Sequence, residues 1–204
     1  MRTQAGSNIT VNDNWALAVN AAQIPTNLRP ADPRESAILT GLAPGSYTAI
    51  ESGKSGATGK GRLEVYDVHS VASSQLANIS TRGFVGTGNE VIGGHIVRGG
   101  AYPVLVRALG PSLAPFGIVN VLTDPTIELR DANGVLVAAN DNWKQIQQTT
   151  IQATGLQPPN DADAAISTIL PSGAFTAIVR GAHGGSGIAL LEVYNLEPPV
   201  RAAP

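Results

Sequence analysis

The sequence predicts an all-β protein built as an antiparallel β-sandwich of the jelly-roll kind. Short apolar-rich runs recur at regular spacing, and turn residues separate them, with 23 Gly and 14 Pro in 204 residues. Signals for helix are weak and short. A four-residue motif, Asn-Asp-Asn-Trp, occurs at 12–15 and again at 140–143, so the chain also contains an internal repeat.

The repeat predicts the domain organisation. Trp143 follows Trp15 by 143 − 15 = 128 residues, and the register holds without a gap from Arg2/Arg130 to Tyr66/Tyr194. Roughly a third of the aligned positions are identical. The matched residues that define the repeat include Asn12, Asp13, Trp15 and Tyr66 in the first copy and Asn140, Asp141, Asn142, Trp143 and Tyr194 in the second. We therefore predict one and a half copies of a unit of about 128 residues: a second half at 1–68, a complete unit at 69–196 and a Pro-rich tail at 197–204.

In the first copy, residues 6–13 alternate weakly after a turn and predict a strand that ends before Trp15. Three prolines between 16 and 33 exclude a long helix and leave a loop with at most a short helical turn near 17–23. Three further strands are expected at 36–42, 46–52 and 61–68, and a glycine-rich hairpin loop, 53–59, joins the last two.

The complete unit begins with strand signals that have no counterpart earlier in the chain, at 77–85, 91–98, 102–109 and most of 124–130. The apolar run Val104-Leu105-Val106 predicts a strand buried on both faces. Asn133-Gly134 suits a type I′ hairpin. The remaining elements expected are strands at 135–139, 165–170, 174–180 and 188–196, and a polar stretch at 144–154 that suits a short surface helix.

Composition excludes several classes of function. The net charge is −2 and the 13 Lys and Arg are scattered, so nucleic acid is not an expected partner. There is no Cys, so disulfides and thiolate metal sites are excluded. No apolar run approaches the roughly 18 residues of a membrane span.

Catalytic motifs are also missing from the pattern, and we expect no enzyme. His69, His95 and His183 are far apart and have no spaced partner motif. Ser112 lacks the second Gly of a nucleophile elbow and is expected to be a loop serine. The glycine-rich stretch 181–187 leads into a strand, whereas phosphate-binding loops lead into a helix.

Oxygen-bearing side chains near the repeated motif are candidates for calcium ligands, namely Asp131, Asn133, Asn140 and Asp141. The competing interpretation is that these side chains cap their own turns while Trp143 closes the end of the core. We favour capping, because the first copy has Thr3 where the second has Asp131. No cofactor is expected, and calcium is the only ion that the residues suggest.

Half a sandwich at 1–68 would leave strand edges and an apolar face uncovered. Three explanations remain open. The chain is a fragment of a longer tandem array, residues 1–68 pair with 69–122 as a permuted sandwich, or a neighbouring subunit supplies the missing strands. In the last two cases a head-to-tail contact that does not close on itself generates a filament.

Two sets of residues carry a resemblance to known modules. The run Asp-Pro-Thr-Ile-Glu-Leu-Arg-Asp-Ala-Asn-Gly at 124–134, with Asn140-Asp141 and 170–179, resembles the bacterial pre-peptidase C-terminal type of β-sandwich. Residues 78–83 and 107–113 are similar to runs in tandem β-sandwich modules of large secreted bacterial surface proteins. This resemblance implies an extracellular or cell-surface, non-catalytic module used for adhesion, display or assembly.

We therefore expect a non-enzymatic extracellular structural protein, a subunit of a surface fibre or matrix. Copies of the chain would assemble head to tail by β-strand complementation between subunits. The alternative is a carbohydrate- or matrix-binding accessory module of a secreted enzyme or adhesin. That alternative needs an exposed aromatic platform, and a solvent-exposed Trp15 or Trp143 would favour it.

Overall fold

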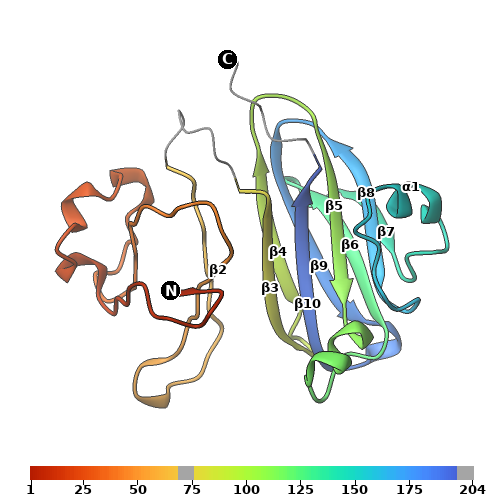
Figure 1. Cartoon of the computed structure of the whole chain (residues 1–204), viewed down its shortest axis with the longest axis horizontal. Helices are drawn as coiled ribbons and strands as arrows, with labels where there is room; N and C mark the ends of the chain where they lie inside the picture. Colours follow the sequence, from red (N-terminus) through yellow and green to blue (C-terminus); the bar gives the residue numbers. More distant parts are fainter. Residues whose placement is uncertain (69–75, 197–204) are drawn as a thin grey trace. The chain divides into compact units, whose positions relative to one another are not determined.

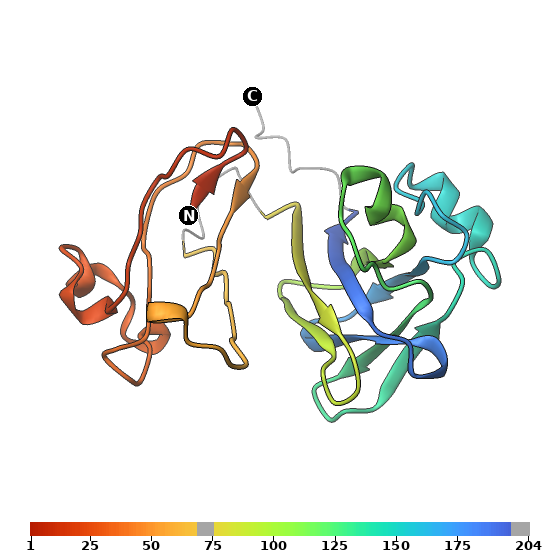
Figure 2. The same ribbon diagram turned by 90° about the horizontal axis from the view of Figure 1, so that it is seen from below.

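A computed structural model describes residues 1–68 and 76–196. The chain divides into unit 1, Met1–Val68, and unit 2, which begins at His69. Unit 2 is an antiparallel β-sandwich of two four-stranded sheets (Figure 1 and Figure 2). The predicted fold class, an all-β sandwich, is confirmed. His69 and the expected tail at 197–204 lie outside the described residues.

The two sheets of unit 2 have the strand orders β3-β10-β5-β8 and β4-β9-β6-β7, and neighbouring strands in both are antiparallel. In unit 2, the strands predicted from the sequence agree with the observed strands to within one residue at each end. The strands are β3 Asn78–Val85, β4 Val91–Val97, β5 Tyr102–Leu109, β6 Pro125–Asp131, β7 Leu136–Asn140, β8 Ala164–Leu170, β9 Gly173–Gly181 and β10 Gly187–Asn195. The helical elements are η5 Pro111–Phe116, α1 Gln148–Ala153 and η6 Ala182–Gly184.

The main core of unit 2 lies between the sheets, where alternate residues of each strand point inward. Strand β5 is buried on both faces, as its continuous apolar run predicts. Val104 and Val106 face the main core, whereas Leu105 faces a second, smaller cluster on the outside of its sheet. That cluster contains Trp143 and Ile151, which the loop after β7 and helix α1 place over β5 and β8.

The hairpin between β6 and β7 is not the predicted type I′ turn. A type I′ turn needs positive φ at both central residues, and in this turn only Gly134 has one, at 78°. The Asp131 carboxylate accepts backbone N–H groups of Asn133 and Val135 at 2.9 Å each, and the pairing register shifts between Leu129 and Arg130. The aspartate-capped turn and this register shift therefore set the local geometry.

Unit 1 contains much less sheet than predicted. Its one sheet pairs β1 Arg2–Thr3 with β2 Tyr47–Thr48. The strands expected at 6–13, 36–42 and 61–68 are not formed among the described residues. The other elements are single helical turns, η1 Trp15–Leu17, η2 Ala21–Gln23, η3 Thr26–Leu28 and η4 Lys54–Gly56. The physical reason is the lack of neighbours, because a strand is stable only when other strands pair with it and a core covers one face.

Candidate functional site

The repeated Asn-Asp-Asn-Trp motif forms a cap at one end of unit 2. Trp143 is 3% exposed, and its indole Nε1 donates to the carbonyl oxygen of Asn160 at 3.1 Å. Its backbone N–H donates to the carbonyl of Asp163 at 3.0 Å. Asn140 Oδ1 accepts the backbone N–H of Ala165 at 3.0 Å. The motif thus ties the end of β7 to the chain that enters β8.

The same three contacts occur in unit 1, and a fourth is shared by both units. Trp15 Nε1 donates to Asp32 O at 3.2 Å, and Trp15 N donates to Glu35 O at 2.8 Å. Asn12 Oδ1 accepts the Ala37 N–H at 3.0 Å, and Asn12 and Asn140 both donate from Nδ2 to the carbonyl two residues later, at 3.2 Å. The local fold of the motif therefore forms without the surrounding sheets.

The tryptophans do not form an exposed aromatic platform. Trp143 is buried, and Lys144 Nζ lies 5.4 Å from the centre of its ring. Trp15 is partly buried, and the guanidinium of Arg29 lies 5.9 Å from its ring centre. The alternative function as a carbohydrate-binding module lacks the exposed tryptophan that would favour it.

The four candidate calcium ligands are not brought together. Asn140 pairs with Ile127 at one end of the β6–β7 hairpin, whereas Asp131 lies four residues further along β6, about 13 Å away at the rise of a strand. Oδ1 of Asp131 accepts two backbone N–H groups, and Oδ1 of Asn140 accepts one. Within residues 1–68 and 76–196, no cluster of three or more His, Cys, Asp and Glu is placed to hold a metal ion.

A buried ion pair lies on the outer face of the β3-β10-β5-β8 sheet. Arg107 of β5 donates from Nε to Glu192 Oε2 at 2.9 Å and from Nη2 to the same oxygen, and both side chains are 11% exposed. Arg107 Nη2 also donates to Tyr194 Oη at 2.9 Å, and its guanidinium lies 4.8 Å from the ring centre of Tyr194. Arg107 Nη1 donates to Leu156 O at 2.6 Å. Burial, followed by the Glu192 charge, raises the pKa of Tyr194.

Unit 1 holds two of the three members of this cluster. Tyr66 Oη donates to Glu64 Oε1 at 3.2 Å, as Tyr194 Oη donates to Glu192 Oε1 at 2.9 Å. Glu64 forms an ion pair with Arg62 at 3.0 Å, and these side chains are 45% and 82% exposed. The repeat identifies both Glu-Tyr pairs from the sequence. The repeat does not identify Arg107 as the third member of the cluster, because this arginine has no counterpart in the first copy.

A second polar cluster is more deeply buried. The Asp163 carboxylate accepts the backbone N–H of Gly110 at 2.8 Å and the hydroxyl of Ser112. Ser112 Oγ in turn accepts the backbone N–H of Asn160 at 3.1 Å. Burial raises the pKa of Asp163, and the hydrogen bond from Ser112 opposes that rise. Ser112 is therefore a structural residue that fixes the turn η5 on the start of β8.

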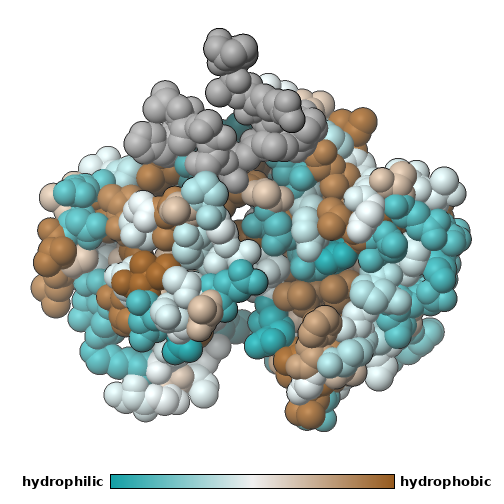
Figure 3. All heavy atoms as spheres, viewed as in Figure 1, coloured by the Kyte–Doolittle hydropathy of each residue, from teal (hydrophilic) through white to brown (hydrophobic). Residues whose placement is uncertain are grey.

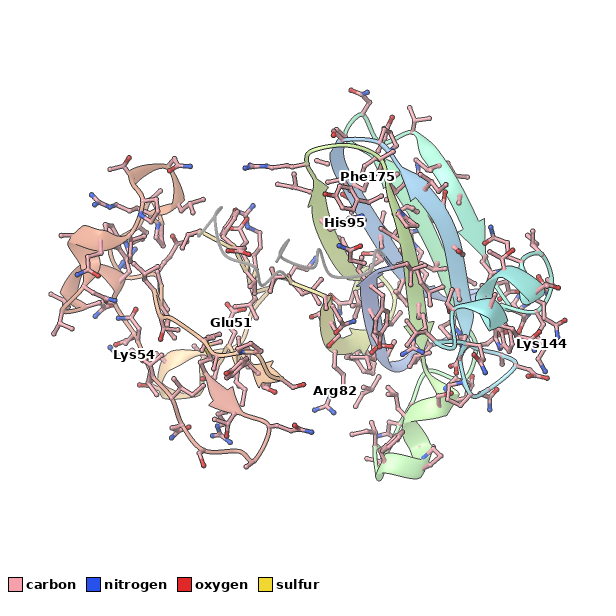
Figure 4. The ribbon with its side chains drawn as sticks, turned by 45° about the horizontal axis from the view of Figure 1, so that its top comes forward. Glu51, Lys54, Arg82, His95, Lys144 and Phe175 are labelled. Carbon is pink, nitrogen blue, oxygen red and sulfur yellow. The ribbon has the colours of Figure 1, made fainter. Side chains whose placement is uncertain are left out.

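The two histidines among the described residues, His95 and His183, do not contact each other. His95 lies on edge strand β4 beside Phe175, with ring centroids 5.7 Å apart (Figure 4). Both ring nitrogens of His95 are buried without a hydrogen-bond partner, and burial lowers its pKa. His183 is exposed in the turn η6, where its φ is 54°. Neither residue is placed for acid–base or nucleophilic chemistry with the other.

Nothing in residues 1–68 and 76–196 folds into a helix with the length and apolarity needed to cross a bilayer. No family model matches the chain, and no curated protein matches it. Among solved structures, the chain is similar to the pre-peptidase C-terminal domain of a collagenase from Bacillus anthracis, with a TM-score of 0.38 and 15% identity. The match covers 57% of this chain and 89% of that one. At that identity and TM-score, the similarity carries no argument about binding or activity.

Proposed function

We propose that this chain is a non-enzymatic structural module of an extracellular or cell-surface assembly, and that copies of it join head to tail by strand complementation. One observation carries the proposal. The segments 36–42, 46–52 and 61–68 form almost no sheet in unit 1, whereas the segments 128 residues later form β8, β9 and β10 within two full sheets.

Unit 1 exposes apolar side chains whose counterparts in unit 2 are buried in the core. Its exposed fractions at these positions are 41% for Ile38, 41% for Leu42, 55% for Leu63 and 46% for Val65. The residues 128 positions later are buried, with exposed fractions of 1% for Ile166, 1% for Leu170, 2% for Leu191 and 8% for Val193. Complete burial of a fully exposed side chain of this kind stabilises a fold by about 1.5–3 kcal/mol, and these side chains, already about half buried, would gain part of that. Covering unit 1 with strands from outside is therefore favourable. Figure 3 shows apolar residues on the visible surface of both units.

Unit 2 offers free strand edges for such a contact. Strands β3 and β4 are edge strands of the two sheets, and together they expose Phe84, Ile92 and Ile96 at 56–59%. Natural edge strands use charged side chains, Lys above all, and Pro to block pairing; β4 contains no Lys, Arg, Asp, Glu or Pro, and β3 contains one charged residue, Arg82. On the opposite side, helix α1 and the loop that carries Trp143 pack beside β7 and β8 (Figure 1). The β3–β4 edge is therefore the favoured surface for a neighbouring unit 1.

The experiment that tests this proposal is negative-stain electron microscopy of the full chain, with its mass measured in parallel by light scattering. We expect filaments or large oligomers that survive dilution, because a heterologous contact does not close on itself. Deleting residues 1–13 or introducing Ile92→Lys with Ile96→Lys should abolish them. Ile146→Lys is the matched control, because Ile146 is 73% exposed but lies outside the strands. A monomer at all concentrations would refute head-to-tail assembly.

A further inference from the structure

The Glu64–Tyr66 pair of unit 1 corresponds to the Glu192–Tyr194 pair of unit 2. In unit 2 that pair binds an arginine, Arg107, and we call such a Glu-Tyr pair an acceptor. Glu192 and Tyr194, 128 residues later, are joined by the same hydroxyl-to-carboxylate hydrogen bond. Arg107, on the central strand β5, donates hydrogen bonds to both. Among the described residues, the carboxylate of Glu64 in unit 1 pairs with the exposed Arg62, two residues away, and accepts the hydroxyl of Tyr66. Two members of a three-residue cluster are present in unit 1, and no strand equivalent to β5 brings the third.

Glu35 provides a second acceptor at the corresponding place. It lies 128 residues before Asp163, and its carbonyl accepts the N–H of Trp15 as that of Asp163 accepts the N–H of Trp143. In unit 2 the carboxylate of Asp163 holds the turn that directly follows β5, through Gly110 and Ser112. The side chain of Glu35 is exposed.

An open hollow of about 500 Å³ lies beside Glu35 in unit 1. Asp32, Arg34 and Glu35 line part of it, and the residues 128 positions later are Asn160, Ala162 and Asp163. In unit 2 these later residues contact η5. Asn160 and Asp163 bond Ser112, and Asn160 and Ala162 line a hollow together with Pro111 and Ala114. The hollow of unit 1 thus lies where unit 2 holds the turn after β5.

We propose that Glu64, Tyr66 and Glu35 form a docking site in unit 1 for a strand-and-turn segment of another polypeptide, one that carries an arginine three residues before a Gly-Pro-Ser turn. Its arginine binds Glu64 and stacks on Tyr66, and its turn occupies the hollow and donates hydrogen bonds to Glu35. The chemistry is that of residues 102–116 of this chain. The inference shares with the proposed function the premise that strands from outside complete unit 1.

The donor of this segment is not a folded copy of the chain. In unit 2, β5 is paired on both sides, with β10 and β8, and a copy that released it would lose the contacts that the acceptor gains. The sequence Gly-Pro-Ser occurs once in the chain, at 110–112, whereas the Glu-Val-Tyr acceptor occurs twice. Folded copies of residues 1–204 therefore leave the acceptor of unit 1 empty. Edges β3 and β4, in contrast, are available on a folded copy.

The test titrates the full chain into a labelled synthetic peptide copied from residues 100–117, with a neutral polyethylene glycol tail for solubility, and measures binding by fluorescence anisotropy. We expect saturable binding that Glu64→Gln weakens at least tenfold. A peptide with Arg107→Glu should bind as weakly, and the chain variant Glu64→Arg should restore its binding. Arg62→Ala should strengthen binding, because Arg62 competes for the Glu64 carboxylate.

The matched control is Glu192→Gln, which alters the occupied acceptor of unit 2. Binding that depends on Glu192 and not on Glu64 would show exchange of the peptide into unit 2 and would overturn the proposal. Binding equal in wild type and Glu64→Gln, or none at millimolar concentration, would overturn it as well. Circular dichroism confirms that each variant is folded. Light scattering of the same samples without peptide reports head-to-tail assembly separately, so the failure of one proposal is distinguishable from that of the other.

Discussion

The indole of Trp143 and the carbonyl of Asn160, 17 positions later in the sequence, are joined by a hydrogen bond of 3.1 Å that closes a loop. The bond from Trp15 to Asp32 closes a loop of the same length in unit 1. Trp143 is buried, whereas Trp15 is only partly buried. The same tryptophan-to-carbonyl hydrogen bond therefore lies in two environments. Its contribution to the free energy of unfolding should differ between them.

Trp143→Phe is expected to lower the free energy of unfolding of unit 2 by about 2 kcal/mol, because it removes the part-buried hydrogen bond to the carbonyl of Asn160 and leaves a small cavity beside Leu105. Trp15→Phe should cost unit 1 less. Each variant keeps one tryptophan, so urea unfolding followed by fluorescence reports unit 1 in Trp143→Phe and unit 2 in Trp15→Phe. We expect unit 1 to unfold at lower urea. Coincident transitions in both variants would contradict this.

Arg107→Ala is expected to destabilise unit 2 by about 3–5 kcal/mol, because it leaves Glu192 as a buried charge without its partner. The effect should be seen as a lower urea midpoint of the Trp143 signal. Glu64→Gln is the control, at the position of unit 1 that corresponds to Glu192. Its ion pair with Arg62 is exposed, and exposed pairs contribute about 0–1 kcal/mol. Equal losses for the two variants would show that burial of the cluster does not matter.

The strands of unit 2 could be predicted from the sequence to within a residue, because alternation and turn residues act locally and the unit contains every strand that its sheets need. Tyr47–Thr48 is the one part of the strands expected in unit 1 that forms, and it forms where β1 supplies a neighbour. Periodicity predicts which residues can form a strand. It does not supply the partner strand, and sheet pairing is non-local.

The polar clusters were harder to predict for a related reason. Glu192 and Tyr194 are found by the repeat, but Arg107 pairs with Glu192 across 85 residues and has no repeated counterpart. Ser112 has the surroundings of a loop serine in the sequence, and only the register of β5 and β8 brings it to Asp163. Contacts that depend on strand order, as these do, leave no local signal.

Ser112→Ala is expected to destabilise unit 2 by about 1–3 kcal/mol at pH 7, because it removes a donor from the buried Asp163 carboxylate. Burial raises the pKa of Asp163 above its ordinary value of 3.8, so the folded state holds its proton to higher pH than the unfolded state. Stability from this group is therefore lost as pH rises above 3.8. Ser112 opposes that loss, so the cost of Ser112→Ala should be smaller at pH 3.5 than at pH 7.

Ser172→Ala provides the control for that comparison, because the Ser172 hydroxyl makes only an exposed contact with Gly100. Its urea midpoint should change little at either pH. A cost of Ser112→Ala that does not vary between the two pH values would show that the serine does not act through the ionisation of Asp163.

His95→Leu is expected to stabilise unit 2, and more so at pH 5 than at pH 7.5. Both ring nitrogens of His95 are buried without partners, and burial lowers its pKa below the ordinary value of 6.5. The folded state then binds fewer protons than the unfolded state, so stability is full above 6.5 and is lost as pH falls towards the folded pKa. The leucine variant removes that loss and keeps an apolar contact with Phe175. Urea unfolding of both proteins at the two pH values measures the difference.

His183→Asn is the control, since His183 is exposed and asparagine tolerates its positive φ. An unchanged pH dependence in His95→Leu would mean that His95 does not titrate with folding.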